Sequence, residues 1–339
     1  MDKTEQIYDG IITNQLLSLR YDAGLRIDVA SSIGRLADTI AGGIAIHEQL
    51  TPAESRRIIR DAKRQIDAAY SDIAQAQRNH MIEYASAEAD AMAALFVKVD
   101  LVAEKIANIE RIIDRAIIQG APSAEWWSRQ AVDFQRRFAD SVRMGMAQGE
   151  STAQMTRRIV GTKALGYSDG IAKIARNNAE ALVRTSVQAV GADTRMAFFE
   201  DNEGLIASYQ QVSTLDGRTS TTCIVRDGLR WKSKSKQPIG HNVPYVATPI
   251  HWNCRSVHVP ILRGETDLDG VNRASMDGQV PADTNFESFM KKKGAAFQDD
   301  VLGARASQLY RDGKISLTQL LDQRGNPLSA TQLRQRYGV

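Results

Sequence analysis

The chain has 339 residues, a formal net charge of +3 and a hydrophobic content of 43%, a balance typical of globular proteins. The near-neutral charge excludes the strongly basic composition of many nucleic-acid binders, and two cysteines are too few for a disulfide framework. No signal-peptide pattern opens the chain, and no apolar run approaches the roughly 20 residues that span a bilayer. We therefore expect two or three domains, synthesis and assembly in the cytoplasm and no membrane partner.

The first part of the chain, residues 1–150, predicts an N-terminal helical arm or bundle. Thr51, Pro52 and Glu54 indicate a helix start, because Thr51 can cap the helix, Pro52 suits its first position and Glu54 can complete a capping box. No proline follows until Pro122, so a long helix can continue from this start.

A seven-residue repeat runs through this stretch. The repeating positions are Ile59, Ile66, Ile73, His80, Ala87, Ala94 and Leu101. The first three predict a helical seam that contacts another helix or subunit. Because an unbroken helix over residues 51–119 would be about 100 Å long, we expect a break near residues 77–79.

Residues 151–262 predict a small α+β domain. A helix is expected over residues 171–200, followed by a strand near residues 209–214. The pairs Asp216-Gly217 and Asp227-Gly228 signal turns. Four prolines between residues 238 and 260 exclude long helices there.

Residues 263–282 are polar and glycine-rich and predict a linker, and residues 283–339 predict a C-terminal helical tail. Two sequences in the tail fit capping boxes, Thr284 to Glu287 and Ser329 to Gln332. The expected fold class is mostly α with a small α+β domain: a long N-terminal helical arm, a small loop-rich β subdomain and short C-terminal helices.

Three potential metal ligands lie within about 30 residues of one another. Cys223, His251 and Cys254 could hold a structural zinc ion if a fourth ligand joined them. The candidates for the fourth ligand are Asp216, His241 and His258. The alternative is that both cysteines are small buried hydrophobic residues.

The same region admits a catalytic interpretation. Asp216, Arg218 and Thr219 could be catalytic, but a structural turn, in which Asp216 binds nearby amides and Arg218 pairs locally, explains them better. His251 and Asn253 resemble half of a nuclease site, yet a helix with a further metal-binding histidine is missing. We therefore expect a structural turn and no enzyme.

Two basic runs could contact nucleic acid or a protein partner. They consist of Lys232, Lys234, Lys236, Lys291, Lys292 and Lys293. Lysines can neutralise phosphates without reading base sequence. The alternative is that each run is a solvated surface.

The run IARNNAEALVRTSVQAVGADTR (174–195), then YQQVSTLDGRTSTTCIVRDG (209–228), then PIHWNCRS (249–256) carries a family resemblance. This order resembles the phage Mu F-type head morphogenesis family of minor head (capsid) proteins. The matching positions are Arg184, Thr185, Asp216, Arg218, Thr219, Cys223, His251, Cys254 and Arg255. Residues 281–322 resemble the same proteins, through Gln298, Asp299, Leu302, Gly303 and Arg311 to Gly313. Ser256 departs from the family, which often ends in Cys-Arg-Cys.

The resemblance implies a minor structural head protein of a tailed bacteriophage. Such a protein docks on the phage portal protein inside the capsid and assists head assembly, DNA packaging or DNA ejection. The implied partners include scaffold or major capsid protein and packaged DNA bound without sequence preference, and the implied location is the virion. Two alternatives remain: a metal-dependent hydrolase or nuclease using Asp216 and His251, and a nonspecific DNA-binding module.

Overall fold

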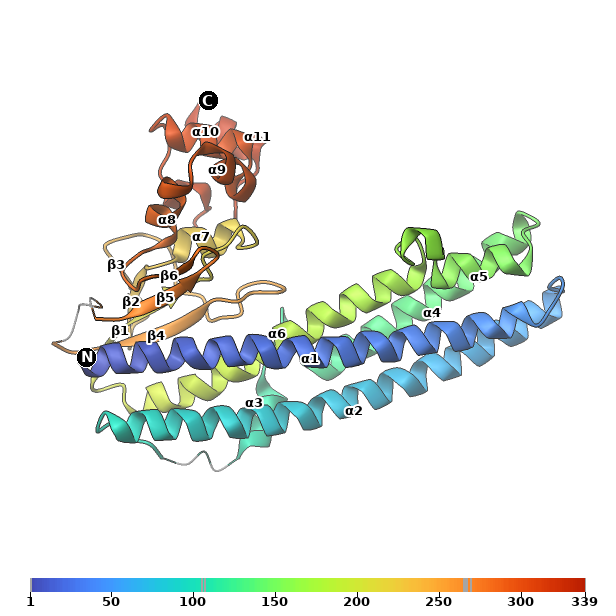
Figure 1. Ribbon diagram of the computed structural model, residues 1–339, viewed down its shortest axis with the longest axis horizontal. Coiled ribbons are helices and arrows are strands. Elements are labelled where there is room, and N and C mark those ends of the chain that lie inside the picture. Colours follow the sequence, from blue (N-terminus) through green and yellow to red (C-terminus); the bar gives the residue numbers. More distant parts are fainter. Residues whose placement is uncertain (1, 105, 107, 265–267, 269, 339) are drawn as a thin grey trace. The chain divides into compact units, whose positions relative to one another are not determined.

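The computed structural model describes residues 2–104, 106, 108–264, 268 and 270–338 (Figure 1). The helices are α1 (Lys3–Ala45), α2 (Pro52–Lys98), α3 (Ile109–Arg115), α4 (Ser123–Ala147), α5 (Thr152–Val160), α6 (Ile171–Asp201), α7 (Thr221–Arg226), α8 (Phe286–Lys293), α9 (Ala295–Leu302), α10 (Ala304–Arg311) and α11 (Ala330–Tyr337), with short 3₁₀ turns at Lys163–Leu165 and Leu317–Leu320. The strands are β1 (Ile206–Val212), β2 (Arg230–Lys232), β3 (Pro238–Ile239), β4 (Val257–Leu262), β5 (Asn272–Ser275) and β6 (Gly278–Pro281). The predicted fold class is therefore confirmed.

The chain forms two compact units, each assembled from separate segments. We call Leu19–Ala85 with Asn108–Val190 the helical unit, and Met1–Ser18, Ser86–Ala107 and Gly191–Val339 the sheet unit. This division does not coincide with the boundaries expected at residues 150, 262 and 282. Long helices cause the difference, because a single helix such as α1 contributes residues to both units.

The helical unit is held by apolar stripes. Along α2, buried residues follow one another at steps of three or four: Ser55, Ile58, Ala62, Ile66, Tyr70, Ile73, Gln77 and Met81. Tyr21 of α1 stacks on Tyr84 of α2 with ring centroids 5.4 Å apart. In α4, Trp127, Ala131, Phe134 and Phe138 recur at helical spacing in the sequence, and all four are buried. Each stripe gives its helix one face that packs away from water.

The predicted helical seam is buried at two of its three positions, and the seven-residue repeat beyond it leaves the buried face. Ile66 and Ile73 are buried, Ile59 is half-buried, and Ala87 and Ala94 are exposed. A straight α-helix has 3.6 residues per turn, so a strict seven-residue repeat drifts by about 20° per heptad away from the buried face. The predicted break at residues 77–79 is also wrong, because α2 continues to Lys98.

The sheet unit contains a four-stranded antiparallel sheet in the order β3-β2-β1-β4. Every residue of β4 is buried, and all but one of β1. The first turn of α1 is fastened to the end of this sheet: Leu262 N donates to Thr4 Oγ1 at 3.1 Å, and Gly270 N donates to Glu5 Oε1 at 2.6 Å. A Cβ at Gly270 would lie 2.6 Å from Glu5 Oε1, so a larger residue there would displace the Glu5 carboxylate.

The predicted linker at 263–282 is wrong for its second half. Asn272 pairs with Pro281 and Ser275 with Gly278 in the hairpin β5-β6, and Arg273 is only 3% exposed. Arg273 Nη1 donates to Asp227 Oδ2 at 3.0 Å and to Thr284 O at 3.0 Å. The polar composition suggested a solvated segment, but Arg273 is buried because it pairs with the buried carboxylate of Asp227, which is distant in the sequence.

The C-terminal helices share an apolar cluster with α7 and the sheet. Leu215, Ile224 and Trp231 lie in the same cluster as Phe286 and Leu309. The capping boxes predicted at Thr51 and Ser329 are present. The one predicted at Thr284 is not, because Asn285 caps α8 by accepting from Ser288 N.

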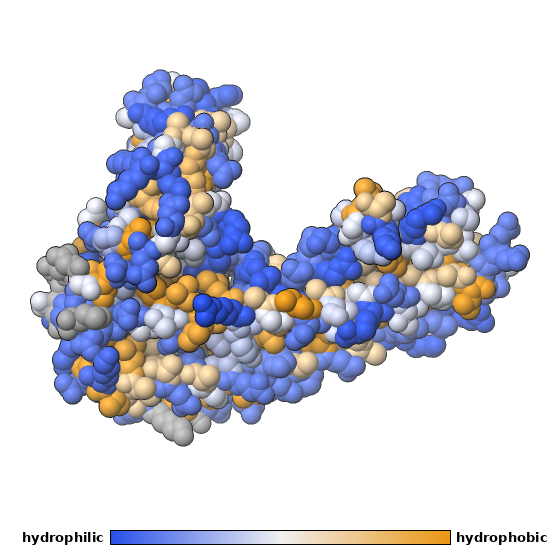
Figure 2. All heavy atoms as spheres, viewed as in Figure 1, coloured by the Kyte–Doolittle hydropathy of each residue, from blue (hydrophilic) through white to orange (hydrophobic). Residues whose placement is uncertain are grey.

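Hydrophilic residues predominate on the face shown in Figure 2, with apolar residues interspersed among them. Exposed apolar side chains include Ile27, Ile46 and Val132 of the helical unit. None of the helices described combines the length and apolar character needed to cross a bilayer.

Candidate metal centre

Two local structures bring the three predicted ligands together. Cys223 lies in the first turn of α7, where Ser220 caps the helix and its Oγ accepts from Cys223 N at 3.4 Å. His251 and Cys254 lie in a tight turn before β4, in which Cys254 N donates to His251 O at 3.1 Å. Asn253 has φ of +62° in this turn, a conformation that asparagine tolerates better than most residues. The turn therefore directs His251 and Cys254 toward α7.

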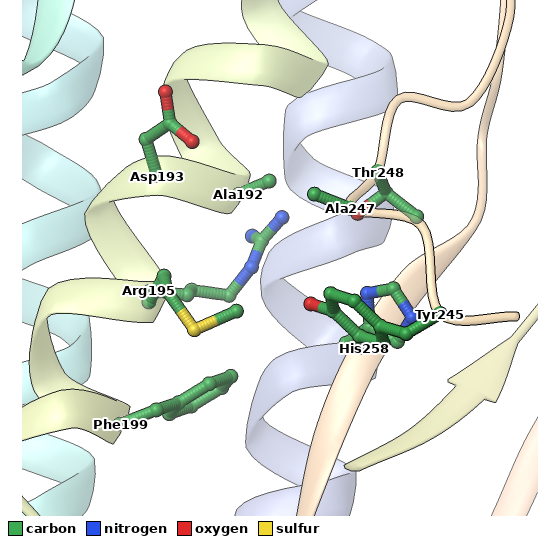
Figure 3. A pocket seen from close by; sticks show the side chains of 9 residues that line it. Ala192, Asp193, Arg195, Phe199, Tyr245, Ala247, Thr248 and His258 are labelled. Carbon is green, nitrogen blue, oxygen red and sulfur yellow. The ribbon is translucent and has the colours of Figure 1, made fainter. Parts of the chain in front are cut away.

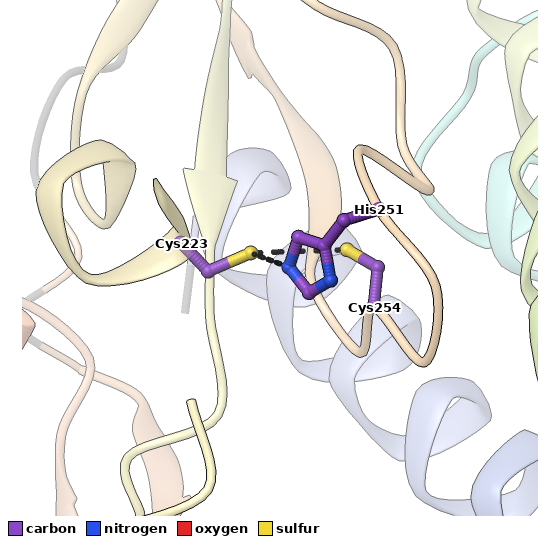
Figure 4. A group of neighbouring side chains, drawn as sticks. All are labelled: Cys223, His251 and Cys254. Carbon is purple, nitrogen blue, oxygen red and sulfur yellow. Dashed lines mark hydrogen bonds between the residues drawn. The ribbon is translucent and has the colours of Figure 1, made fainter. Parts of the chain in front are cut away.

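The three side chains converge in space (Figure 4). The Sγ atoms of Cys223 and Cys254 are 3.8 Å apart, and Cys223 Sγ lies 3.1 Å from His251 Nε2. All three ligand atoms lie within 4.8 Å of one another. Tetrahedral zinc with ordinary bond lengths separates two sulfur ligands by about 3.8 Å and a sulfur from a nitrogen by about 3.5 Å. Cys223, His251 and Cys254 could therefore hold a metal ion.

The hydrogen bonds of His251 fix the tautomer that a metal needs. His251 Nδ1 lies 2.8 Å from Trp252 O, and a carbonyl oxygen can only accept, so Nδ1 carries the proton. Nε2 then presents its lone pair to Cys223 Sγ and to Ser220 Oγ, which is 2.7 Å away. A backbone carbonyl that holds the other ring nitrogen is the usual support of a metal-binding histidine.

The two thiols differ in acidity. The hydrogen bond from Cys254 lowers the pKa of Cys223 to about 7 against the opposing effect of burial, and the hydroxyls of Ser256 and Ser220 help. The pKa of Cys254 is raised by the hydrogen bond with Cys223 and by burial. Cys223 therefore ionises first, and the second thiol loses its proton most readily to a bound cation.

None of the proposed fourth ligands lies at this centre. His241 is held by Arg230 O at 2.9 Å, and His258 packs between Trp231 and Tyr245. Within the described residues, the group of potential ligands ends at three. The adjoining hollow, lined by Ser220, Asn253 and Arg255 among others, has room for roughly one water molecule.

Asp216 is engaged in a different interaction. Arg255 donates to both of its carboxylate oxygens, at 2.6 and 2.7 Å, and Arg218 N donates to Asp216 Oδ1 at 3.0 Å. Burial opposes ionisation, but the hydrogen bonds and charge of Arg255 outweigh it and hold the pKa of Asp216 below its usual range. Thr219 adds a hydrogen bond at 3.2 Å. The carboxylate thus closes the turn and joins it to the loop that contains His251 and Cys254.

Arg218, by contrast, is a surface residue. Its side chain is 84% exposed and lies 3.6 Å from Asp216. Arg255 is the partner that reasoning from the sequence missed. The signal was its position directly after Cys254, which keeps its backbone next to one of the three candidate ligands.

Arg184 and Thr185, which carry the first part of the family resemblance, form structural contacts within the helical unit. Arg184 Nε lies 3.7 Å from the buried carboxylate of Asp22. Thr185 Oγ1 donates to Ala181 O at 2.7 Å, an ordinary bond to the preceding turn of a helix.

The two lysine runs offer fewer free charges than their number suggests. Lys236 is half-buried and lies 4.2 Å above the Tyr209 ring, while Lys291 and Lys293 pair with Glu287 at 2.9 Å and Asp277 at 2.7 Å. Lys232, Lys234 and Lys292 are exposed. The geometry therefore weakens the expectation of a strong phosphate-binding surface at either run.

Comparison of the chain with models of protein families, with curated proteins and with solved structures finds no match.

Proposed function

We propose that this chain is a minor structural head protein of a tailed bacteriophage. In this proposal it docks on the portal protein inside the capsid and assists head assembly, DNA packaging or DNA ejection. The observation that carries the proposal is the convergence of the motif residues: Asp216, Cys223, His251, Cys254 and Arg255 contact one another in pairs. Residues that resemble a family motif and also fold together support the resemblance.

The contacts of these residues favour a structural role over hydrolysis. A general base needs a free lone pair that faces a substrate cleft, and a catalytic metal needs an open coordination position there. Asp216 instead accepts from Arg255, Arg218 and Thr219, and the hollow beside His251 is about the size of a water molecule. We therefore assign Asp216 and His251 the role of holding loops in place.

We further propose that the metal is zinc and that its role is structural. Two thiolates and an imidazole are ligands that zinc prefers. Bound there, the ion would join α7 to the loop before β4, and Ser220 or a water molecule would complete its coordination. A small, loop-rich region gains stability from such a link because metal binding is coupled to folding.

Metal analysis tests the zinc proposal. We expect about one zinc per chain in protein purified without chelator, and a lower melting temperature after chelation. His251→Gln and Cys254→Ser should both lose the metal, whereas His80→Gln, which removes an exposed imidazole of the helical unit, should keep it. The proposal fails if the wild-type protein is purified without metal and its melting temperature changes with neither chelator nor added zinc. In that case the three residues simply pack together.

Sedimentation with the portal ring of the same phage tests the structural role. We expect the chain to co-sediment with the ring and to be present in purified heads. Asp216→Ala should reduce this association only as far as it reduces folding, measured by circular dichroism. A folded Asp216→Ala or His251→Gln protein that loses a hydrolytic activity of the wild type would instead establish the enzyme alternative.

A further inference from the structure

The first turns of α2 carry a cluster of basic side chains. Residues 52–65 contain five basic and two acidic residues, so their net charge of +3 equals that of the whole chain. All five basic side chains are exposed. We call them the basic stripe: Arg56, Arg57, Arg60, Lys63 and Arg64. The near-neutral charge of the chain thus conceals a strongly basic segment in the helical unit.

Helical spacing places the basic stripe on one face of α2. With about 3.6 residues per turn, its five side chains fall within an arc of about 120° and extend over about 12 Å along the axis. Ile58, Ala62 and Ile66, which are buried, lie on the opposite side of the helix. The basic stripe therefore faces away from the helices against which α2 packs.

Most of these charges are not neutralised within the chain. Arg64 pairs with Asp61 at 2.7 Å, yet its side chain is 78% exposed. Within the part of the chain that the structure describes, the other four residues of the basic stripe form no ion pair. Glu54, the other acidic residue of this stretch, already accepts from Thr51 N at 2.8 Å. Four cations thus face solvent within two to three turns of helix.

This arrangement does not help α2 to fold. Basic residues three or four positions apart, such as Arg56 and Arg60 or Arg60 and Arg64, repel one another across one helical turn. The helix dipole favours cations near the end of a helix, whereas these lie near its beginning. Sequence choices that oppose local stability are expected where a surface has a binding function.

The chemistry of the basic stripe fits a polyanion better than a protein surface. No large apolar side chain is exposed between residues 52 and 70, a stretch that the structure describes in full, whereas protein interfaces have cores poor in charge and rich in aromatic residues. Four of the five cations are arginines, whose planar guanidinium groups match phosphate oxygens. Duplex DNA carries one negative charge for about every 1.7 Å of its axis, dense enough to meet all five.

We propose that the basic stripe is a docking surface for the phosphate backbone of double-stranded DNA, bound without regard to base sequence. The choice of double-stranded DNA among polyanions rests on the proposed phage function. The contacts come from α2 of the helical unit and not from the two lysine runs of the sheet unit.

Fluorescence anisotropy with labelled duplexes of about 30 base pairs tests the proposal on the full chain. Each phosphate contact contributes about 0.9 to the slope of log affinity against log salt, so we expect a slope of about −4 to −5 for the wild type. The triple variant Arg56→Gln, Arg60→Gln, Lys63→Gln should have a slope of about −2 and bind at least about tenfold more weakly at low salt. Two duplexes of unrelated sequence should bind equally well.

The matched control is the triple variant Arg129→Gln, Arg136→Gln, Arg143→Gln. These arginines are also exposed in the helical unit, and the same number of charges is removed, but each of them pairs with an acidic residue of α4. Its affinity and salt slope should stay close to those of the wild type. Circular dichroism checks that both variants are folded.

Several results would overturn the proposal: a wild-type protein that does not bind the duplex, a stripe variant with unchanged affinity and slope, or a control that loses as much as the stripe variant. Polyglutamate that competes with DNA at equal charge would instead identify an acidic protein as the partner. The stripe variant should still co-sediment with the portal ring. Portal association without DNA binding contradicts this inference alone, and DNA binding by the basic stripe without portal association contradicts the proposed function alone.

Discussion

The helical unit and the sheet unit are stabilised by different means. Stripes of apolar side chains such as Ile66 and Tyr70 hold the helices together, whereas buried charges cross-link the loops around the sheet. Asp227 accepts from Ser213 N and from Phe286 N, both at 2.6 Å, in addition to its pair with Arg273. A helix satisfies its own backbone hydrogen bonds. A short strand with long loops does not, so buried side chains must supply the missing partners.

The largest expected effect comes from breaking the buried pair of the sheet unit. Arg273→Ala should destabilise the protein by about 3–5 kcal/mol, because it leaves the fully buried carboxylate of Asp227 without its counter-charge. Chemical denaturation monitored by circular dichroism measures this loss. The surface control Arg218→Ala should cost less than about 0.5 kcal/mol. If Arg273→Ala costs no more stability than Arg218→Ala, the buried ion pair of Arg273 and Asp227 does not stabilise the sheet unit.

The corresponding test of the helical unit is Ile66→Ala. Ile66 is fully buried, so we expect a loss of about 2–5 kcal/mol from the cavity and the lost burial. Ile27→Ala in the same unit, where the side chain is 70% exposed, should be nearly neutral. Should Ile27→Ala prove as damaging as Ile66→Ala, the exposed face of α1 must be covered by a partner in solution.

A smaller effect should appear as a pH dependence at Asp216. Its pKa in the folded protein is lowered, so the stabilisation by Arg255 is complete above about pH 4, the ordinary pKa of an aspartate, and is lost as the pH falls through the folded value. Asp216→Asn should therefore lose about 1 kcal/mol at neutral pH and progressively less in acid. Urea unfolding at several pH values measures the difference between the two proteins. A difference that stays constant with pH would contradict an ionic role for Asp216.

The sequence predicted best what is local. The amphipathic pattern of α4 identified its buried face because helical periodicity is decided within a few turns. The metal centre could be suspected because cysteine and histidine are few in this chain and their chemistry is distinctive. In each case a short stretch of residues contains the whole signal.

Contacts between distant residues escaped prediction. Arg273 and Asp227 are 46 positions apart, and Arg255 and Asp216 are 39 apart. Neither spacing follows a helical or strand period, so only the folded chain shows that an arginine in a polar stretch is buried. The small cavity lined by residues 192–199 and 245–258 (Figure 3) escaped for the same reason, since its two walls are far apart in the sequence.

The attachment of α1 to the end of the sheet has a consequence for synthesis on the ribosome. Thr4 and Leu262 are separated by 258 positions, and translation proceeds at about 5–20 residues per second, so Thr4 waits roughly 10–50 seconds for its partner. Throughout that time Ile7, Tyr8 and Ile11, which are fully buried in the finished protein, have no completed sheet to contact. The first turns of α1 are thus made well before the strand that they contact, and a chaperone that shields their apolar face should raise the yield of folded protein.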